Sequence, residues 1–303
     1  MLCPYCLQDT SGTACQHCKE TLPPLYVQRR GVFSKGPAIL SAVGFSGHGK
    51  TVYLASLLYM LEKRLTQVWP KFYRQALDID GVRTVQDNLK LLQEGNLPES
   101  TRRNFPRPNA HLLADIPHYG TRDMLIYDPP GEAFNSDEGI ERYAFFVQRA
   151  RVILFLVSLV DLEEPKAEDL FRLLNTYVLG MARMKAKTRN QHLVVAYTKA
   201  DRLIATFGKH PAVLDHLRNA DHSAMVNPKK YLDTLKMISA DLAVFTEQEL
   251  EARAFMNLTH DQFKSVVFCA VSALGSPPEG EHLATAIEPR RVADPLIWVL
   301  DKS

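Results

Sequence analysis

An eight-residue segment, Gly-Phe-Ser-Gly-His-Gly-Lys-Thr at residues 44–51, constrains the fold of this chain more than any other feature. It fits the pattern G-x-x-x-x-G-K-[ST] of a phosphate-binding loop. Gly44 and Gly49 let the backbone aim successive N–H groups at phosphate oxygens. Lys50 supplies a positive charge, and the hydroxyl of Thr51 can ligate Mg²⁺. The segment therefore predicts a site for a nucleotide and its metal ion.

The residues on both sides of the segment support this interpretation. Residues 39–43 are apolar and predict a buried strand. After the loop, leucines recur at helical spacing from Leu54 to Leu65, which predicts a helix whose N-terminus faces the anion. His48 is unusual in such a loop: its side chain could touch a phosphate, but we expect it to turn to solvent. The candidate nucleotide-binding residues here are Ser46, Gly47, His48, Gly49, Lys50 and Thr51.

A second motif, Asp-Pro-Pro-Gly at residues 128–131, ends a predicted strand centred near Ile126. An Asp at the carboxyl end of a strand beside a phosphate loop can hold Mg²⁺ through water. The N–H of Gly131 can then meet the γ-phosphate. We therefore expect Asp128 to join Thr51 as a Mg²⁺ ligand.

Two further motifs point to guanine as the base. Thr198-Lys199-Ala200-Asp201 follows an apolar run and fits [NT]-K-x-D. The Asp201 carboxylate can accept hydrogen bonds from two guanine N–H groups, and adenine offers no such pair. The aliphatic stem of Lys199 can lie across the base. The last motif resembles the S-A-[KL] box, whose backbone contacts the guanine oxygen, and comprises Ser272, Ala273 and Leu274.

The N-terminal segment carries two C-x-x-C knuckles with eight residues between them. This spacing matches a tetrahedral Zn²⁺ site. A piece of about 20 residues cannot bury a core, so the metal must supply its folding energy. Two disulfides are the alternative, but nothing suggests secretion, so we expect reduced thiols and Zn²⁺. The four expected zinc ligands, with His17 as a possible substitute, are Cys3, Cys6, Cys15 and Cys18.

With these motifs in order, the chain resembles the P-loop GTPases of the translation-factor and Ras-like (TRAFAC) group over residues 37–303. Within that group it is similar to the bacterial double-GTPase family with an N-terminal zinc ribbon. This finer resemblance rests on the zinc-type head and on residues 97–101 and 292–298. It implies an α/β fold, a P-loop NTPase three-layer sandwich with a mainly parallel sheet. It also implies GTP hydrolysis with Mg²⁺, as a molecular switch within a multi-protein bacterial system.

One departure from the GTPase pattern bears on catalysis. Glu132 stands directly after Asp-x-x-Gly, where many GTPases carry a Gln that orients the attacking water. A carboxylate can order a water, but it lies near a highly anionic γ-phosphate, so we expect slow turnover without a partner. A nucleotide-stabilised scaffold or adaptor with little or no hydrolysis is the alternative. An ATPase is a third option, which would require Asp201 to play no part in base recognition.

The Thr that closes over Mg²⁺ in the first switch is the other open position. Thr101 is the preferred candidate because it follows a predicted helix end and precedes the strand at 110–116. Thr84 is the alternative, although it falls within an apparent helix. Arg102 or Arg103 could serve as an arginine finger in cis, but such a pair is more often a solvated basic loop. The catalytic candidates are thus Lys50, Glu132 and Thr101.

Composition favours a cytoplasmic protein without a membrane span. The net charge of +2 does not predict a nucleic-acid or membrane partner, and the hydrophobic content of 46% can fill a sizeable core. The longest apolar run, at 152–160, is too short to cross a bilayer and suits a strand buried on both faces. Residues 1–20 lack the pattern of a signal peptide.

The expected organisation has three parts: a zinc ribbon at 1–20, a linker at 21–36 and a GTPase domain at 37–303. The domain alternates strands and helices, with a helical insertion at about 202–262 and a closing helix at 292–300. Protein partners are expected to use the switch loops, the insertion and the zinc ribbon, which we regard as a docking module or cap. Predicted strands centre near Leu40, Leu113, Ile126, Leu154, Val195 and Val267.

Overall fold

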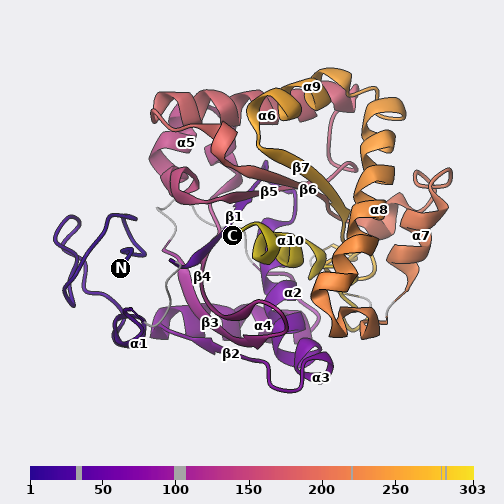
Figure 1. Cartoon of the computed structure of the whole chain (residues 1–303). Coiled ribbons are helices and arrows are strands. Elements are labelled where there is room, and N and C mark those ends of the chain that lie inside the picture. Colours follow the sequence, from indigo (N-terminus) through magenta and orange to yellow (C-terminus); the bar gives the residue numbers. More distant parts are fainter. Residues whose placement is uncertain (32–35, 99–106, 220, 281, 284) are drawn as a thin grey trace.

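The computed structural model describes residues 1–31, 36–98, 107–219, 221–280, 282–283 and 285–303. In this part of the chain, seven strands form one sheet of order β2-β3-β4-β1-β5-β6-β7 (Figure 1). β2 and β3 run antiparallel to their neighbours, and every other pair is parallel. The predicted mainly parallel sheet is confirmed. The strands are β1 (Ala38–Val43), β2 (Tyr73–Ala76), β3 (Asn109–Ile116), β4 (Gly120–Tyr127), β5 (Val152–Val157), β6 (His192–Tyr197) and β7 (Ser265–Ala270).

Helices cover both faces of the sheet, so the predicted three-layer sandwich is confirmed (Figure 1). α5 (Asp137–Tyr143), α6 (Lys166–Arg183) and α9 (Arg253–Gln262) pack on one face, while α2 (Lys50–Lys63) and α10 (Asp294–Lys302) pack on the other. The remaining α-helices are α1 (Pro24–Gln28), α3 (Leu65–Val68), α4 (Ile79–Gln93), α7 (Pro211–Arg218) and α8 (Pro228–Gln248). Short 3-10 turns are η1 (Gly131–Asn135), η2 (Phe145–Arg149), η3 (Thr188–Asn190), η4 (Ala200–Leu203) and η5 (Ser223–Val226).

The central strands are apolar on both faces because each face contributes to a different core. In β1, Ile39 and Val43 join the core beneath α6, whereas Leu40 and Ala42 join the core beneath α2. Trp298 of α10 is buried in this second core, as expected. Strands that are buried on both faces have nearly continuous apolar sequences, and these apolar runs are what predicted their positions.

The segment between the base-reading motif and the last strand folds into α7, α8 and α9 (Figure 1). α8 lies against β7, where the hydroxyl of Ser239 accepts a hydrogen bond from the N–H of Phe268 at 2.8 Å. Its buried side chains are shared between both cores: Ile238 joins one and Leu235 the other. α8 therefore closes this edge of the sandwich.

The N-terminal head lies at one side of the sandwich, beside α1 (Figure 1). Two small antiparallel bridges, between Leu2 and Asp9 and between Ala14 and Thr21, hold its knuckles. The head is fastened to the sheet by a hydrogen bond from the Tyr127 hydroxyl to the carbonyl of Pro4. No helix among the described residues has the length and apolar character needed to cross a membrane.

Candidate functional site

The phosphate loop connects the carboxyl end of β1 to the first turn of α2. Gly47 and Gly49 have φ angles of +81° and +79°, which side chains rarely tolerate. A Cβ on Gly44 would lie 2.4 Å from the carbonyl oxygen of Leu156 on the neighbouring strand β5. The glycine spacing is therefore fixed by backbone shape and packing, and the N-terminus of α2 faces the loop.

The side chain of Lys50 folds back over the loop and is only 7% exposed. Its Nζ donates hydrogen bonds to the carbonyl oxygens of Gly44 and Phe45, each at 3.0 Å. Burial lowers the pKa of Lys50 to about 8, although the carboxylates of Asp128 and Glu132 oppose this shift. Lys50 is thus a nearly desolvated cation at the loop, placed to bind an anion strongly.

Thr51 and Asp128 come together from different parts of the chain. Asp128 follows β4, which pairs with β1, and the Thr51 hydroxyl donates a hydrogen bond to its Oδ2 at 2.7 Å. Two adjacent hard oxygen donors, one of them anionic, suit Mg²⁺, which takes one or two protein oxygens and keeps several waters. The chemistry of this pair fits the predicted metal.

Gly131 lies directly against the phosphate loop. A Cβ at this position would lie 2.3 Å from the backbone nitrogen of Ser46, so only glycine fits. Glu132 follows in the first turn of η1, is half-buried, and is close enough to affect the charge of Lys50. The structure therefore brings Glu132 to the phosphate end of the site.

The candidates for the first switch lie in parts of the chain whose side chains the structure does not describe. Thr101, Arg102 and Arg103 lie outside the described residues, as does part of the stretch 97–101. Thr84 lies within α4, but its side chain is also outside what the structure describes.

His48 does not turn to solvent, and that expectation is wrong. The residue is 2% exposed, and its Nδ1 lies 3.3 Å from the carbonyl oxygen of Leu156. Burial, and then the charge of Lys50, lower the pKa of His48 to about 4. The imidazole is therefore neutral at neutral pH and fills space between β5 and the loop, because the loop turns this side chain inward.

The base-reading loop follows β6 and approaches the phosphate loop from the side. The hydroxyl of buried Thr198 donates a hydrogen bond to the carbonyl oxygen of His48 at 2.9 Å. Asp201 accepts a hydrogen bond from the hydroxyl of Ser272 at 2.5 Å. That hydroxyl also accepts from the N–H of Gly275 at 2.9 Å, so the Ser272–Ala273–Leu274 loop holds the Asp201 carboxylate in place.

Sequence reasoning missed Asp161, which lies four residues beyond the carboxyl end of β5. Its Oδ2 accepts a hydrogen bond from the Lys199 ammonium at 2.6 Å, and the hydroxyl of Ser158 also donates to it. Lys199 itself has a φ of +54°. Asp161 thus directs the Lys199 side chain along the mouth of the base site. Its position after an apolar strand, at the same sheet edge as the motifs, was the available signal.

The four head cysteines converge as the spacing predicted. All are free thiols, and their sulfur atoms lie within 4.8 Å of one another. The Sγ atoms of Cys3 and Cys18 are 3.8 Å apart, and those of Cys6 and Cys15 are 3.5 Å apart. A tetrahedral zinc site with Zn–S bonds of about 2.3 Å has sulfur separations of about 3.8 Å. The cluster therefore fits Zn²⁺ and contains no disulfide.

Several solved structures are similar to this chain at low identity. The signal recognition particle receptor SRb-GTP/SRX complex from Chaetomium thermophilum is 13% identical with a TM-score of 0.40, covering 89% of this chain and 100% of that chain. The GTP-bound Ski7 GTPase-like domain of S. cerevisiae is 13% identical with a TM-score of 0.32, and the match covers 88% of this chain and 50% of that chain. The small COPII coat GTPase SAR1 from Encephalitozoon cuniculi, in complex with GDP, is 10% identical with a TM-score of 0.30. The match covers 89% of this chain and 82% of that chain.

Comparison with curated proteins finds no match. A family model described as Double-GTPase 2, however, matches residues 38–271, from the start of β1 to just beyond β7. This span contains the phosphate loop, the Asp-Pro-Pro-Gly segment and the base-reading loop, and it makes up most of the chain. The chain therefore belongs to the Double-GTPase 2 family of P-loop GTPases.

Proposed function

We propose that this GTP-binding protein binds GTP with Mg²⁺ and hydrolyses it slowly, as a molecular switch in a multi-protein system. One observation carries the proposal: a phosphate loop, an oxygen pair suited to Mg²⁺ and a fixed Asp201 carboxylate meet at one edge of the sheet. Ligands of open α/β sheets bind at the carboxyl ends of the strands.

At the phosphate end, the backbone N–H groups of the loop and the Lys50 ammonium would bind the β- and γ-phosphates. Lys50 would exchange its bonds to the carbonyls of Gly44 and Phe45 for bonds to phosphate. Thr51 and Asp128 would hold Mg²⁺, which neutralises charge on the phosphate oxygens when bound. Gly131 would present its N–H toward the γ-phosphate from beside Ser46.

At the base end, Asp201 would accept two hydrogen bonds from guanine, in the orientation that Ser272 fixes. The stem of Lys199 would cover the base while Asp161 holds its ammonium. Thr198 would keep the base loop and the phosphate loop at a constant separation.

Hydrolysis would depend on Glu132, which would order the attacking water from η1. A carboxylate next to an anionic phosphate is poorly suited to this role, which supports slow turnover. The same observation favours a second candidate function, a scaffold whose fold is stabilised by GTP or GDP and which barely hydrolyses GTP. In either case, the switch loops, the helical segment 202–262 and the zinc-binding head are the proposed contact surfaces for protein partners, in the cytoplasm.

Nucleotide content and single-turnover kinetics of the purified protein test this proposal. We expect bound GDP or GTP, much weaker ATP binding, and phosphate release at about 10⁻⁴–10⁻² s⁻¹ without a partner. Lys50→Ala serves as the control that should lose tight triphosphate binding. Equal affinities for ATP and GTP would contradict the proposal, whereas GTP binding without phosphate release would favour the scaffold.

A further inference from the structure

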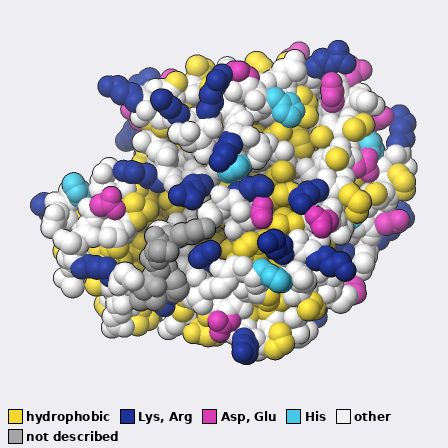
Figure 2. Space-filling model, viewed as in Figure 1, with side chains coloured by type: hydrophobic (Ala, Val, Ile, Leu, Met, Phe, Trp, Pro, Cys, Tyr) yellow, Lys and Arg dark blue, Asp and Glu magenta, His cyan; other side chains and the backbone are white. Residues whose placement is uncertain are grey.

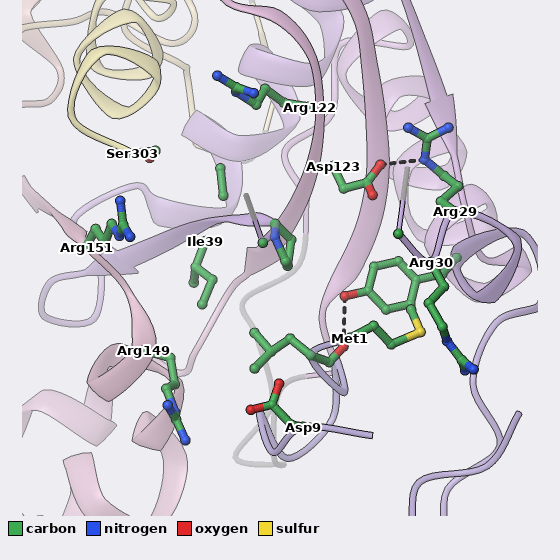
Figure 3. A pocket seen from close by; sticks show the side chains of 16 residues that line it. Met1, Asp9, Arg29, Arg30, Ile39, Arg122, Asp123, Arg149, Arg151 and Ser303 are labelled. Carbon is green, nitrogen blue, oxygen red and sulfur yellow. Dashed lines mark hydrogen bonds and ion pairs between the residues drawn. The ribbon is translucent and has the colours of Figure 1, made fainter. Parts of the chain in front are cut away.

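A cavity of about 670 Å³ lies at the opposite edge of the sheet from the nucleotide site. Its floor includes Ala38 and Ile39, where β1 begins, and its walls come from the N-terminal head, the α1 segment and β4 (Figure 3). β1 runs from this cavity to the phosphate loop over six residues, which is about 20 Å of strand. The cavity is thus separate from the site described above.

The side chains that line the cavity are strongly positive. Five arginines face it against two carboxylates, Asp9 and Asp123, which leaves an excess of three positive charges among the side chains. Figure 3 shows that these arginines come from separate segments: Arg122, Arg149 and Arg151 lie on one side of the pocket, and Arg29 and Arg30 lie on the other side, beyond Met1. Figure 2 shows lysine and arginine side chains gathered across the middle of the face that carries the head. The five are Arg29, Arg30, Arg122, Arg149 and Arg151.

Only part of this charge is neutralised within the protein. Arg29 is paired with Asp123 at 2.5 Å, and Arg30 donates to the carbonyl oxygen of Gly12 at 2.7 Å. Within the described part of the chain, the side chains of Arg122, Arg149 and Arg151 make no ion pair or hydrogen bond. Arg149 and Arg151 are also exposed. Three guanidinium groups are therefore available to an anion that enters the cavity.

We propose that this cavity binds a small ligand that carries two or more phosphate groups. The planar guanidinium fork matches phosphate oxygens in a bidentate manner, more closely than a lysine does. Cavities of about 300–1,000 Å³ hold ligands of metabolite size. The free arginines reach the cavity from β4 and from both ends of the η2–β5 connection, so they offer separate guanidinium forks to a ligand with more than one phosphate group. Inorganic polyphosphate and a second nucleotide share this chemistry.

Calorimetric titration of the full-length, zinc-loaded protein with inorganic tripolyphosphate, in the presence of saturating GDP, tests this proposal. The double variant Arg149→Ala/Arg151→Ala should bind tripolyphosphate at least tenfold more weakly while keeping its affinity for GDP. Arg149→Lys/Arg151→Lys keeps the charge but loses the guanidinium fork. Its affinity for tripolyphosphate should lie between those of the unmodified protein and the double alanine variant. A parallel titration with ATP separates a nucleotide ligand from inorganic polyphosphate.

The matched control is Arg189→Ala/Arg253→Ala, which removes the same charge from arginines that are 70% and 77% exposed and lie outside the cavity. Its affinity for tripolyphosphate should equal that of the unmodified protein. If Arg149→Ala/Arg151→Ala and this control weaken tripolyphosphate binding equally, the attraction is one of general charge, and the proposal is overturned. Loss of tripolyphosphate binding on addition of GDP or in Lys50→Ala, with the arginine variant unaffected, would place the anion at the phosphate loop and also overturn it.

Discussion

The hydroxyl of Thr198 donates a hydrogen bond to the carbonyl oxygen of His48 at 2.9 Å, so the base-reading loop holds the phosphate loop directly. Both residues are buried, and the N–H of Thr198 is bonded in turn to the carbonyl oxygen of Val157 at 2.8 Å. His48 is fixed from its other side by Leu156. The two halves of the nucleotide site therefore form one hydrogen-bonded unit at the end of β5.

Replacing Thr198 with Val tests this unit. The change keeps the side-chain shape but leaves the buried His48 carbonyl without its donor, at a cost of about 1–3 kcal/mol. We expect GDP affinity to fall about tenfold and the free energy of unfolding to fall as well. Thr198→Ser, which keeps the hydroxyl, should behave like the unmodified protein in fluorescence titrations. Unchanged GDP affinity in Thr198→Val would show that the bond does not position the loops.

Asp201→Asn tests the base. The Asn side chain can accept one guanine hydrogen bond but presents a donor in place of the second acceptor, so GTP binding should weaken by about 2–4 kcal/mol. Relative affinity for xanthine nucleotides should rise, because xanthine offers an acceptor at that position. Competition binding measures both changes. Asp161→Asn, which leaves Asp201 intact, is the control and should not improve xanthine binding.

The motifs located the site because each one stands at the end of a buried strand. Parallel strands place their carboxyl ends at one sheet edge, so the order of motifs predicted which residues would meet. Thr51 and Asp128, 77 positions apart, are in hydrogen-bond contact as a result. The cysteine spacing was equally informative, because two C-x-x-C turns leave few arrangements other than a shared metal.

Features without an apolar pattern could not be predicted in this way. β2 reads Tyr-Arg-Gln-Ala and alternates between exposed and half-buried residues. Among the described strands it pairs with β3 alone, so no buried run marks it. The inward turn of His48 depends on the loop backbone, and a polar residue in a loop is ordinarily expected to face solvent. The arginines of the cavity at the opposite edge of the sheet come from the end of α1, from β4 and from the η2–β5 connection, so their meeting depends on the tertiary fold and not on a local pattern.

Lys50 makes nucleotide affinity depend on pH. Burial lowers its pKa to about 8, so it is charged below pH 8 and loses its proton above that value in the nucleotide-free protein. Phosphate binds the charged form, so binding above pH 8 must take up a proton and becomes weaker as pH rises. We expect the GDP dissociation constant to stay nearly constant between about pH 6.5 and 7.5 and to rise between about pH 8 and 9. Lys50→Ala should bind weakly without this dependence, and an identical pH profile in both proteins would contradict the assignment.

The head should contain one Zn²⁺ that stabilises the whole chain. Cys3→Ser should release the metal, because it removes a buried thiolate ligand. Since Tyr127 bonds to Pro4, Tyr127→Phe should lower the free energy of unfolding by about 1 kcal/mol. Residues 37–303 alone should still bind GTP, because no head residue touches the phosphate loop among the contacts described. Elemental analysis and thermal unfolding provide the measurements, and a metal-free protein with two disulfides would refute the zinc site.

Glu132 decides between a switch and a scaffold. If its carboxylate orders the attacking water, Glu132→Ala should slow single-turnover hydrolysis at least tenfold while leaving GTP affinity nearly unchanged. Glu132→Gln restores the residue that many GTPases carry and should hydrolyse GTP at least as fast as the unmodified protein. If neither change alters the rate, Glu132 is only a surface residue of η1, and Arg102 and Arg103 become the next residues to replace. Unassisted turnover of many per second would instead show that the chain contains a complete active site and needs no activating partner.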